Sequence, residues 1–153
     1  MKVEFINPFL SATLEVLKTM ASTEARPRPP VLKQDSVSHG DVSGIIGITG
    51  PFKGSLSLSF SQPCILSIVA KMLGEKFPEI NAEIKDAVGE LTNMISGAAR
   101  QNLEAMGYKF QSSLPTVVSG PNHQIKHQCQ APTIAIHFDT SVGSFMVEVS
   151  FEN

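Results

Sequence analysis

The chain has 153 residues, which suits one domain with a sizeable buried core and leaves little room for a second. Its net charge of −2 and its lack of any Lys/Arg cluster argue against nucleic acid and anionic membranes as partners. No segment approaches the ~18 consecutive apolar residues of a membrane span, and Cys64 and Cys129 lack the spacing of a secreted disulfide scaffold. We therefore expect a cytoplasmic protein with reduced thiols.

A first helix is predicted to begin at Asn7 and Pro8, with Asn7 as N-cap and Pro8 at the first helical position. The helix should end near Ala21, because the proline-rich stretch 27–30 cannot continue it. Its predicted buried residues are Phe9, Leu10, Leu14, Leu17 and Met20. Residues 31–37 are predicted to form a short edge strand.

A β-hairpin is predicted next, because residues 42–48 and 56–60 are rich in β-forming residues and are joined by a Gly- and Pro-containing turn at 50–54. Serines at 55, 57 and 59 alternate with apolar residues, so one face of the second strand is polar and the other belongs to the core. A short helix at 62–73 follows, with Gly74 as its C-cap.

A long helix is predicted from about Asn81 to Met106, ended by Gly107. The last third of the chain is then predicted to form strands at 109–114, 116–119, 125–130, 133–138 and 144–151. Residues 54–60 faintly echo residues 143–151, each the second strand of a hairpin. We therefore predict an α+β fold of two helix–strand–hairpin halves, with their hairpins in one antiparallel sheet and the helices packed on one face.

The long helix has two different faces. Its predicted buried stripe consists of Ile84, Val88, Leu91, Ile95, Ala98 and Met106. On the opposite face Glu90 and Asn93 project side by side, about 60° apart around the axis, and Gly97 lies one turn further on. Gly89, Asn93 and Gly97 each cost about 0.5–1 kcal/mol relative to Ala. A purely structural helix has no reason to keep them.

The Glu90/Asn93 pair has a possible chemistry. The Asn93 carboxamide both donates and accepts hydrogen bonds, so it can hold a water in attacking geometry, and phosphoryl transfer depends mostly on such positioning. The ionised Glu90 would accept from a partner's Lys or Arg. The spacing alone is a weak signal, because Glu4 and Asn7 share it and Asn7 is explained as a cap.

Other candidate sites have weaker support. His123, His127 and Cys129 could share one face of a strand and bind zinc, but no fourth ligand is evident nearby, so surface histidines and a packed thiol are the default interpretation. Two His/Asp groupings, His39 with Asp41 and His137 with Asp139, lack the nucleophile context of a serine or cysteine hydrolase. The glycines at 44, 47, 50 and 54 form no strand-to-helix phosphate loop.

One run of the long helix resembles the signature of the CheX-like members of the CheC/CheX/FliY phosphatases of bacterial chemotaxis. The run is Asp86-Ala87-Val88-Gly89-Glu90-Leu91-Thr92-Asn93-Met94-Ile95-Ser96-Gly97. The resemblance extends to residues 6–9, 40–47 and 145–151, and so along most of the chain. It implies a CheC-like fold, with residues 1–153 forming one phosphatase domain.

The resemblance also implies a function. The substrate would be a phosphorylated CheY-type response regulator, with Asn93 orienting the water that attacks the aspartyl phosphate and Glu90 pairing with the regulator's lysine. The regulator would keep its own Mg²⁺, so this chain would need no cofactor. The single motif implies a CheX-like homodimer formed through the sheets. The alternative is a non-catalytic module that binds a receiver domain through the same helix face.

Overall fold

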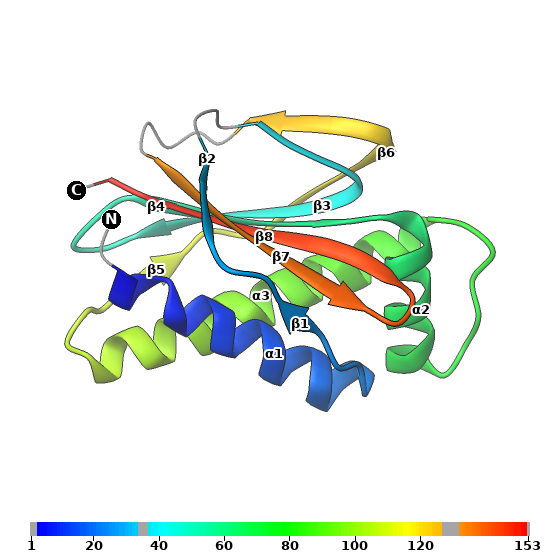
Figure 1. The fold of residues 1–153 in the computed structure, drawn as a ribbon, viewed down its shortest axis with the longest axis horizontal. Helices are drawn as coiled ribbons and strands as arrows, with labels where there is room; N and C mark the ends of the chain where they lie inside the picture. Colours follow the sequence, from blue (N-terminus) through cyan, green and yellow to red (C-terminus); the bar gives the residue numbers. More distant parts are fainter. Residues whose placement is uncertain (1–2, 34–36, 127–131, 153) are drawn as a thin grey trace.

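An antiparallel sheet of eight strands, covered on one face by three helices, makes up the described part of the chain (Figure 1). The computed structural model describes residues 3–33, 37–126 and 132–152. The predicted α+β class, with an antiparallel sheet and helices packed on it, is confirmed.

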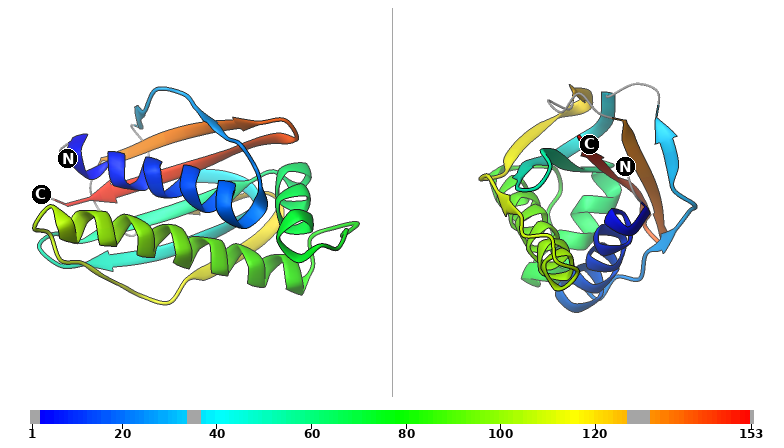
Figure 2. Two further views of the ribbon diagram at one scale, coloured as in Figure 1. Left: turned by 90° about the horizontal axis from the view of Figure 1, so that it is seen from below. Right: turned by 90° about the vertical axis from the view of Figure 1, so that its left-hand side faces the viewer.

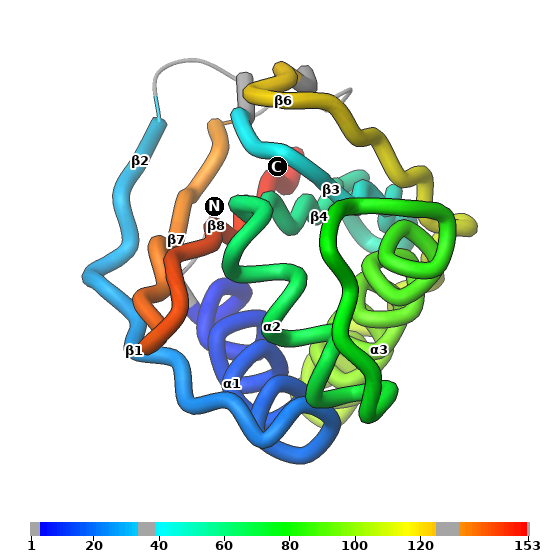
Figure 3. Tube along the Cα trace, turned by 90° about the vertical axis from the view of Figure 1, so that its right-hand side faces the viewer, coloured from blue at the N-terminus to red at the C-terminus, as the bar shows by residue number. Residues whose placement is uncertain are grey.

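The helices form one layer. Helix α1 covers Asn7–Ala21 after a 3₁₀ turn at Val3–Phe5, α2 covers Gln62–Leu73, and α3 covers Ala82–Ala105. Helices α1 and α3 lie side by side and antiparallel over the sheet (Figure 2). Helix α2 stands at the end of the molecule where α1 finishes and α3 begins (Figure 3).

Two hairpins form the centre of the sheet. The strands are β1 (Arg26–Pro27), β2 (Val31–Lys33), β3 (Val37–Thr49), β4 (Gly54–Phe60), β5 (Gln111–Ser112), β6 (Thr116–Lys126), β7 (Thr133–Thr140) and β8 (Gly143–Phe151). Strand β4 pairs with β8 along its whole length, and β3 and β7 flank this central pair. The remaining strands extend the two sides of this central group, since β1 and β2 pair with β7, and β5 and β6 pair with β3. This arrangement is compatible with two related halves, while their duplication stays a prediction.

The start of α1 differs from the prediction. Its N-cap is Ile6, and Asn7 lies inside the helix without acting as a side-chain cap. The preceding 3₁₀ turn leads directly into α1, so the N–H groups of Phe9 and Leu10 donate to the Ile6 carbonyl at 3.0 and 3.1 Å. Pro8 in the first turn fits this arrangement because it has no N–H to satisfy.

Two methionines predicted to be buried are exposed. Met20 and Met106 each keep 42% of their surface accessible, and each lies at the C-terminal end of its helix. In the last turns of α3 the buried positions belong instead to Ala99 and Leu103. Helical periodicity identified the buried faces of α1 and α3 but extended each of them too far at its C-terminal end.

Strand boundaries also differ. The strands predicted at 116–119 and 125–130 are replaced by one strand, β6, which ends at Lys126, while residues 127–130 lie outside the described part. The strand predicted at 109–114 shortens to β5. The predicted strand at 31–37 is β2 plus the first residue of β3, with 34–36 not described. Strand β1 was not predicted. The serine face of β4 is polar as predicted, yet Ser55, Ser57 and Ser59 are all buried.

Candidate active site on helix α3

The first turn of α3 is fixed by a side-chain cap. Asn81 is in an extended conformation, and its Oδ1 accepts a hydrogen bond from the Ile84 N–H at 3.0 Å. This bond satisfies one of the N–H groups that a helix start leaves free. The predicted start is thereby confirmed, and the rotation of the helix is set by the residues that follow.

Close packing against β3 fixes the rotation of α3. A Cβ at Gly44 of β3 would overlap Thr92 Oγ1 and would lie 3.3 Å from Val88 Cγ1. Thr92 itself is fully buried and donates to the Val88 carbonyl at 2.7 Å. The missing side chain at Gly44 lets α3 lie directly on the strand, so the opposite side of the helix must face outward.

Glu90 and Asn93 are on that outward side. Both are exposed, whereas Gly89, Leu91 and Thr92 beside them are buried. Within the described residues, neither side chain forms a hydrogen bond or an ion pair. By helix geometry they are about 60° apart and about 4.5 Å apart along the axis, so one partner group can reach both. Their predicted exposure on one face is confirmed.

The two glycines near this pair are not required by the packing of the chain. A Cβ on Gly89 would make ordinary contacts, 3.5 Å from Val117 Cγ2 and 3.8 Å from Pro115 Cγ. A Cβ on Gly97 would have only Arg100 Nη2 nearby, at 4.0 Å. The chain itself could therefore accommodate alanine at both positions, but Gly89 is buried, so only the half-buried Gly97 is accessible to a partner.

A cleft opens next to Glu90 and is lined by residues of all three helices. Figure 3 shows these helices at the end of the molecule where α2 lies. The volume of the cleft is about 380 Å³, and it is lined by Met20, Met72, Leu73, Glu83, Asp86, Ala87 and Glu90. Sequence reasoning missed this cleft because it assigned Met20 to the core. The available signal was the series of acids at 83, 86 and 90, which share one helix face.

The histidine and cysteine candidates are only partly described. His127 and Cys129 lie outside the described residues, so a zinc site with His123 stays a prediction. The His123 ring is already in use, because Nδ1 donates to the Gly120 carbonyl at 3.1 Å and Nε2 lies 2.8 Å from Ser43 Oγ. The described ranges contain no group of three His, Cys, Asp or Glu residues arranged for a metal.

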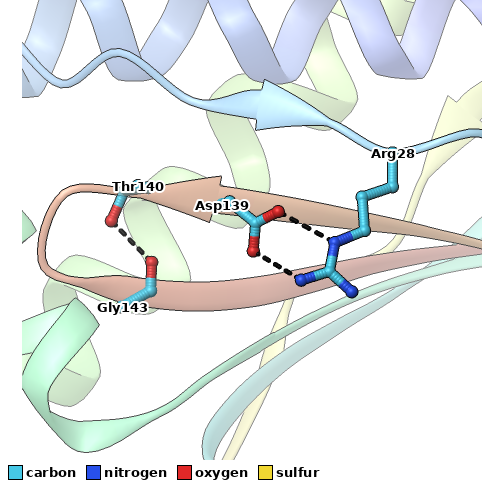
Figure 4. A network of polar contacts seen from close by, with 4 residues as sticks. All are labelled: Arg28, Asp139, Thr140 and Gly143. Atoms are coloured by element: carbon cyan, nitrogen blue, oxygen red, sulfur yellow. Dashed lines mark hydrogen bonds and ion pairs between the residues drawn. The ribbon is translucent and has the colours of Figure 1, made fainter.

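The two aspartates considered for hydrolase chemistry have structural roles. Asp41 accepts from the backbone N–H of Gln62, at the start of α2, and from that of Asn122. Asp139 accepts two hydrogen bonds from the Arg28 guanidinium, at 2.8 and 2.9 Å (Figure 4). These bonds hold the pKa of Asp139 below its ordinary value and tie the β1 segment to β7.

The described cysteine, Cys64, is a free buried thiol. Burial raises its pKa to about 11, and a hydrogen bond with Thr140 partly opposes that effect. A thiol with such a pKa stays protonated near neutral pH and is a poor nucleophile. The prediction of a reduced thiol is confirmed for Cys64, while Cys129 lies outside the described residues.

None of the helices in the described ranges is long and apolar enough to cross a membrane.

Comparisons with known proteins point to one family. Residues 42–139 match the family described as chemotaxis phosphatase CheX. The chain is 31% identical over 128 residues to the CheY-P phosphatase CheX of Thermotoga maritima, a match that covers 82% of each protein.

Solved structures of CheX proteins are also similar to this chain. Chemotaxis protein CheX from Desulfovibrio desulfuricans is 45% identical, with a TM-score of 0.93 over 98% of this chain and all of that one. The CheX of a CheX–CheY–BeF₃–Mg²⁺ complex from Borrelia burgdorferi is 24% identical, with a TM-score of 0.83 over 99% and 100% of the two chains. At that identity the likeness concerns the fold alone.

Proposed function

This chain belongs to the CheX family of chemotaxis phosphatases, and we propose that it hydrolyses the aspartyl phosphate of a phosphorylated CheY-type response regulator. Water attacks phosphorus, the bond between phosphorus and the aspartyl oxygen breaks, and inorganic phosphate leaves the regenerated carboxylate. The observation that carries this proposal is the exposed Glu90/Asn93 pair on a helix whose neighbouring residues are buried.

Asn93 is proposed to orient the attacking water. A carboxamide does not act as a general base near neutral pH, but it can accept from the water and donate to a phosphoryl oxygen at once. Phosphoryl transfer requires mainly positioning and charge stabilisation, so such a side chain suffices. Its exposure, with no hydrogen-bond partner in the described part of the chain, supports this role.

Glu90 is proposed to anchor the regulator by accepting from its active-site lysine. The carboxylate is exposed about one turn before Asn93 and has no ion pair within the described residues. An N⁺–H···O⁻ bond formed there would fix the regulator's position relative to Asn93. The Mg²⁺ is proposed to stay with the regulator, so that this chain contributes no cofactor site.

Two further properties belong to this proposal. The protein is proposed to act in the cytoplasm, where response regulators are phosphorylated. It is also proposed to form a homodimer through its sheet, which would leave the helix layer available for the regulator.

The decisive experiment compares phosphate release from the phosphorylated regulator with wild-type protein and with Asn93→Ala. We expect the substitution to reduce the rate to that of the regulator alone, because the water loses its positioning group. Asn102→Ala is a matched control, since Asn102 is also exposed on α3 and lies far from the pair. If Asn93→Ala is as active as wild type, the catalytic assignment is wrong.

The alternative, a non-catalytic module that binds a receiver domain, predicts different results for binding and for phosphate release. Such a module would bind the regulator without accelerating phosphate release. Glu90→Lys should weaken binding in either case, because two cations would then face each other, whereas Glu104→Lys on the same helix should not. Unaltered binding by the Glu90 variant would disprove the proposed pairing.

A further inference from the structure

We propose that the cleft beside Glu90 is a docking site for the response regulator when it binds α3. The cleft receives an apolar side chain of the regulator that is flanked by lysine or arginine. This inference rests on the proposed function and extends it from two side chains to a surface. The cleft is lined by residues of α1, α2 and α3. Three observations carry the inference: the apolar floor, the acidic rim, and continuity with Asn93.

The floor of the cleft is apolar and accessible. Leu73 is 51% exposed and Met20 is 42% exposed, and Met72 of α2 and Ala87 of α3 also line the cleft. Burying such side chains in a partner removes apolar surface from water, worth about 25 cal/mol per Å². The flexible methionines can adapt to the shape of an inserted side chain. The floor thus favours an apolar group from the partner.

The rim of the cleft is acidic. Glu83, Asp86 and Glu90 follow one another at spacings of three and four, so they share one side of α3. None of them forms an ion pair within the described residues, and like charges at these spacings disfavour the helix.

The helix dipole explains only part of this acidic series. It favours Glu83 in the first turn, but its effect falls off before Asp86 and Glu90. An acidic partner would be repelled, and a purely apolar one would desolvate unpaired carboxylates. A partner with lysine or arginine around its apolar group fits both the floor and the rim.

The cleft is continuous with the proposed catalytic strip. Glu90 lines the cleft, and Asn93 lies one turn further along the helix. From Asp86 to Asn93 is about 10.5 Å along the axis, well within a footprint of about 800 Å² per partner. A regulator whose lysine reaches Glu90 therefore covers the cleft as well. This continuity is the reason to assign the cleft to the regulator.

The test measures the Kd for the regulator held in its active form by BeF₃⁻ and Mg²⁺, using full-length wild type and variants. Leu73→Ser should raise the Kd about fivefold or more, because it replaces an exposed apolar side chain that lines the cleft. Leu32→Ser is its matched control, since Leu32 is 54% exposed but lies on β2, away from the cleft. The control should bind as wild type does.

A second variant tests the rim. Glu83→Gln combined with Asp86→Asn should raise the Kd about threefold to tenfold at low salt, and the difference should nearly vanish at about 0.5 M NaCl. Glu104→Gln, at the far end of α3, should leave the Kd unchanged at both salt concentrations. Thermal unfolding of each variant checks that an altered Kd does not come from misfolding.

The possible results separate this inference from the proposed function. If Leu73→Ser and the combined Glu83→Gln, Asp86→Asn variant both bind as wild type does, the proposed docking site is disproved, whatever the rate of phosphate release. If wild type binds but does not accelerate phosphate release, the phosphatase proposal fails, and the Kd comparison still decides the docking site. If the wild-type protein does not bind the activated regulator, the docking site is also wrong.

Discussion

At the scale of single residues, α3 keeps side chains that do not favour a helix. Asn93 is exposed and forms no hydrogen bond within the described part of the chain, so nothing in the fold compensates for its lower helix propensity. Thr92, next to it, is buried and packed against β3. Unfavourable local choices at exposed positions, beside well-packed buried ones, are what a functional surface predicts.

Gly97 gives the sharpest test at this scale. Gly97→Ala should increase the free energy of unfolding by about 0.5–1 kcal/mol, because alanine is the better helix former and the nearest atom to the added Cβ is Arg100 Nη2 at 4.0 Å. The same substitution should slow phosphate release, because a methyl group would then stand on the surface that the regulator approaches. Denaturant unfolding and the phosphatase assay measure the two effects.

The control for Gly97→Ala is Gln101→Ala, one turn further along the exposed side of α3. It should leave both stability and phosphate release nearly unchanged. A Gly97→Ala protein that is more stable and equally active would show that the glycine gives the partner no necessary clearance.

At the scale of elements, the contact between α3 and β3 positions the site. Gly44→Ala should lower the free energy of unfolding by about 1–3 kcal/mol, because the new methyl group overlaps Thr92 Oγ1 and crowds Val88. Denaturant unfolding measures this loss. Because α3 must shift to relieve the overlap, we also expect slower phosphate release.

A double-mutant cycle with Thr92→Ala tests the cause. Removing Oγ1 relieves the worst overlap, so the double variant should be more stable than the sum of the single effects predicts. Strictly additive losses would mean that the Gly44 substitution acts somewhere other than at the α3 contact.

The ion pair between Arg28, just after β1, and Asp139 of β7 predicts that stability depends on pH. Arg28 lowers the pKa of Asp139, so the pair contributes stability above the ordinary carboxylate pKa of about 3.9, and this contribution is lost as the pH falls through the lower native value (Figure 4). Asp139→Asn removes the titrating group. Its unfolding temperature should lie slightly below that of wild type at pH 6, and the gap should close in acid.

Arg28 and Asp139 are both solvent-exposed, so the difference in unfolding temperature between wild type and Asp139→Asn should be small and should shrink with added salt. A gap that stays constant from pH 6 down to pH 2 would rule out ionisation of Asp139 as its source.

At the scale of the whole molecule, periodicity predicted most elements but not their limits. The alternation in residues 42–60 identified the β3–β4 hairpin, and the 3.6-residue pattern located α3 to within one residue at each end. The prediction divided β6 into two strands on either side of Gly120 and Pro121, residue types that usually interrupt strands. In the structure Gly120 has a φ of +152° and lies where the pairing with β3 shifts register. A bulge absorbs these residues without ending the strand.

The shared exposed face of Glu90 and Asn93 was predictable from the sequence, whereas the cleft was not. Glu90 and Asn93 are three residues apart on one helix, so helical geometry alone places them together. The cleft requires Met20 and Leu73, from two other helices, to meet the first turns of α3. That meeting depends on how the helices cross the sheet, which periodicity does not encode. Single-helix features were therefore visible in the sequence, and features shared between helices were not.

The separation of the molecule into a helix layer and a sheet leads to the last prediction. If the homodimer forms through the sheet, sedimentation should give twice the chain mass of 16.5 kDa at micromolar concentration. The Asn93→Ala and Leu73→Ser variants should sediment as wild type does, because both positions lie in the helix layer (Figure 2). A monomeric mass for wild type would contradict the proposed dimer. A dimer lost on Leu73→Ser would place the interface on the helices, where it would compete with the regulator.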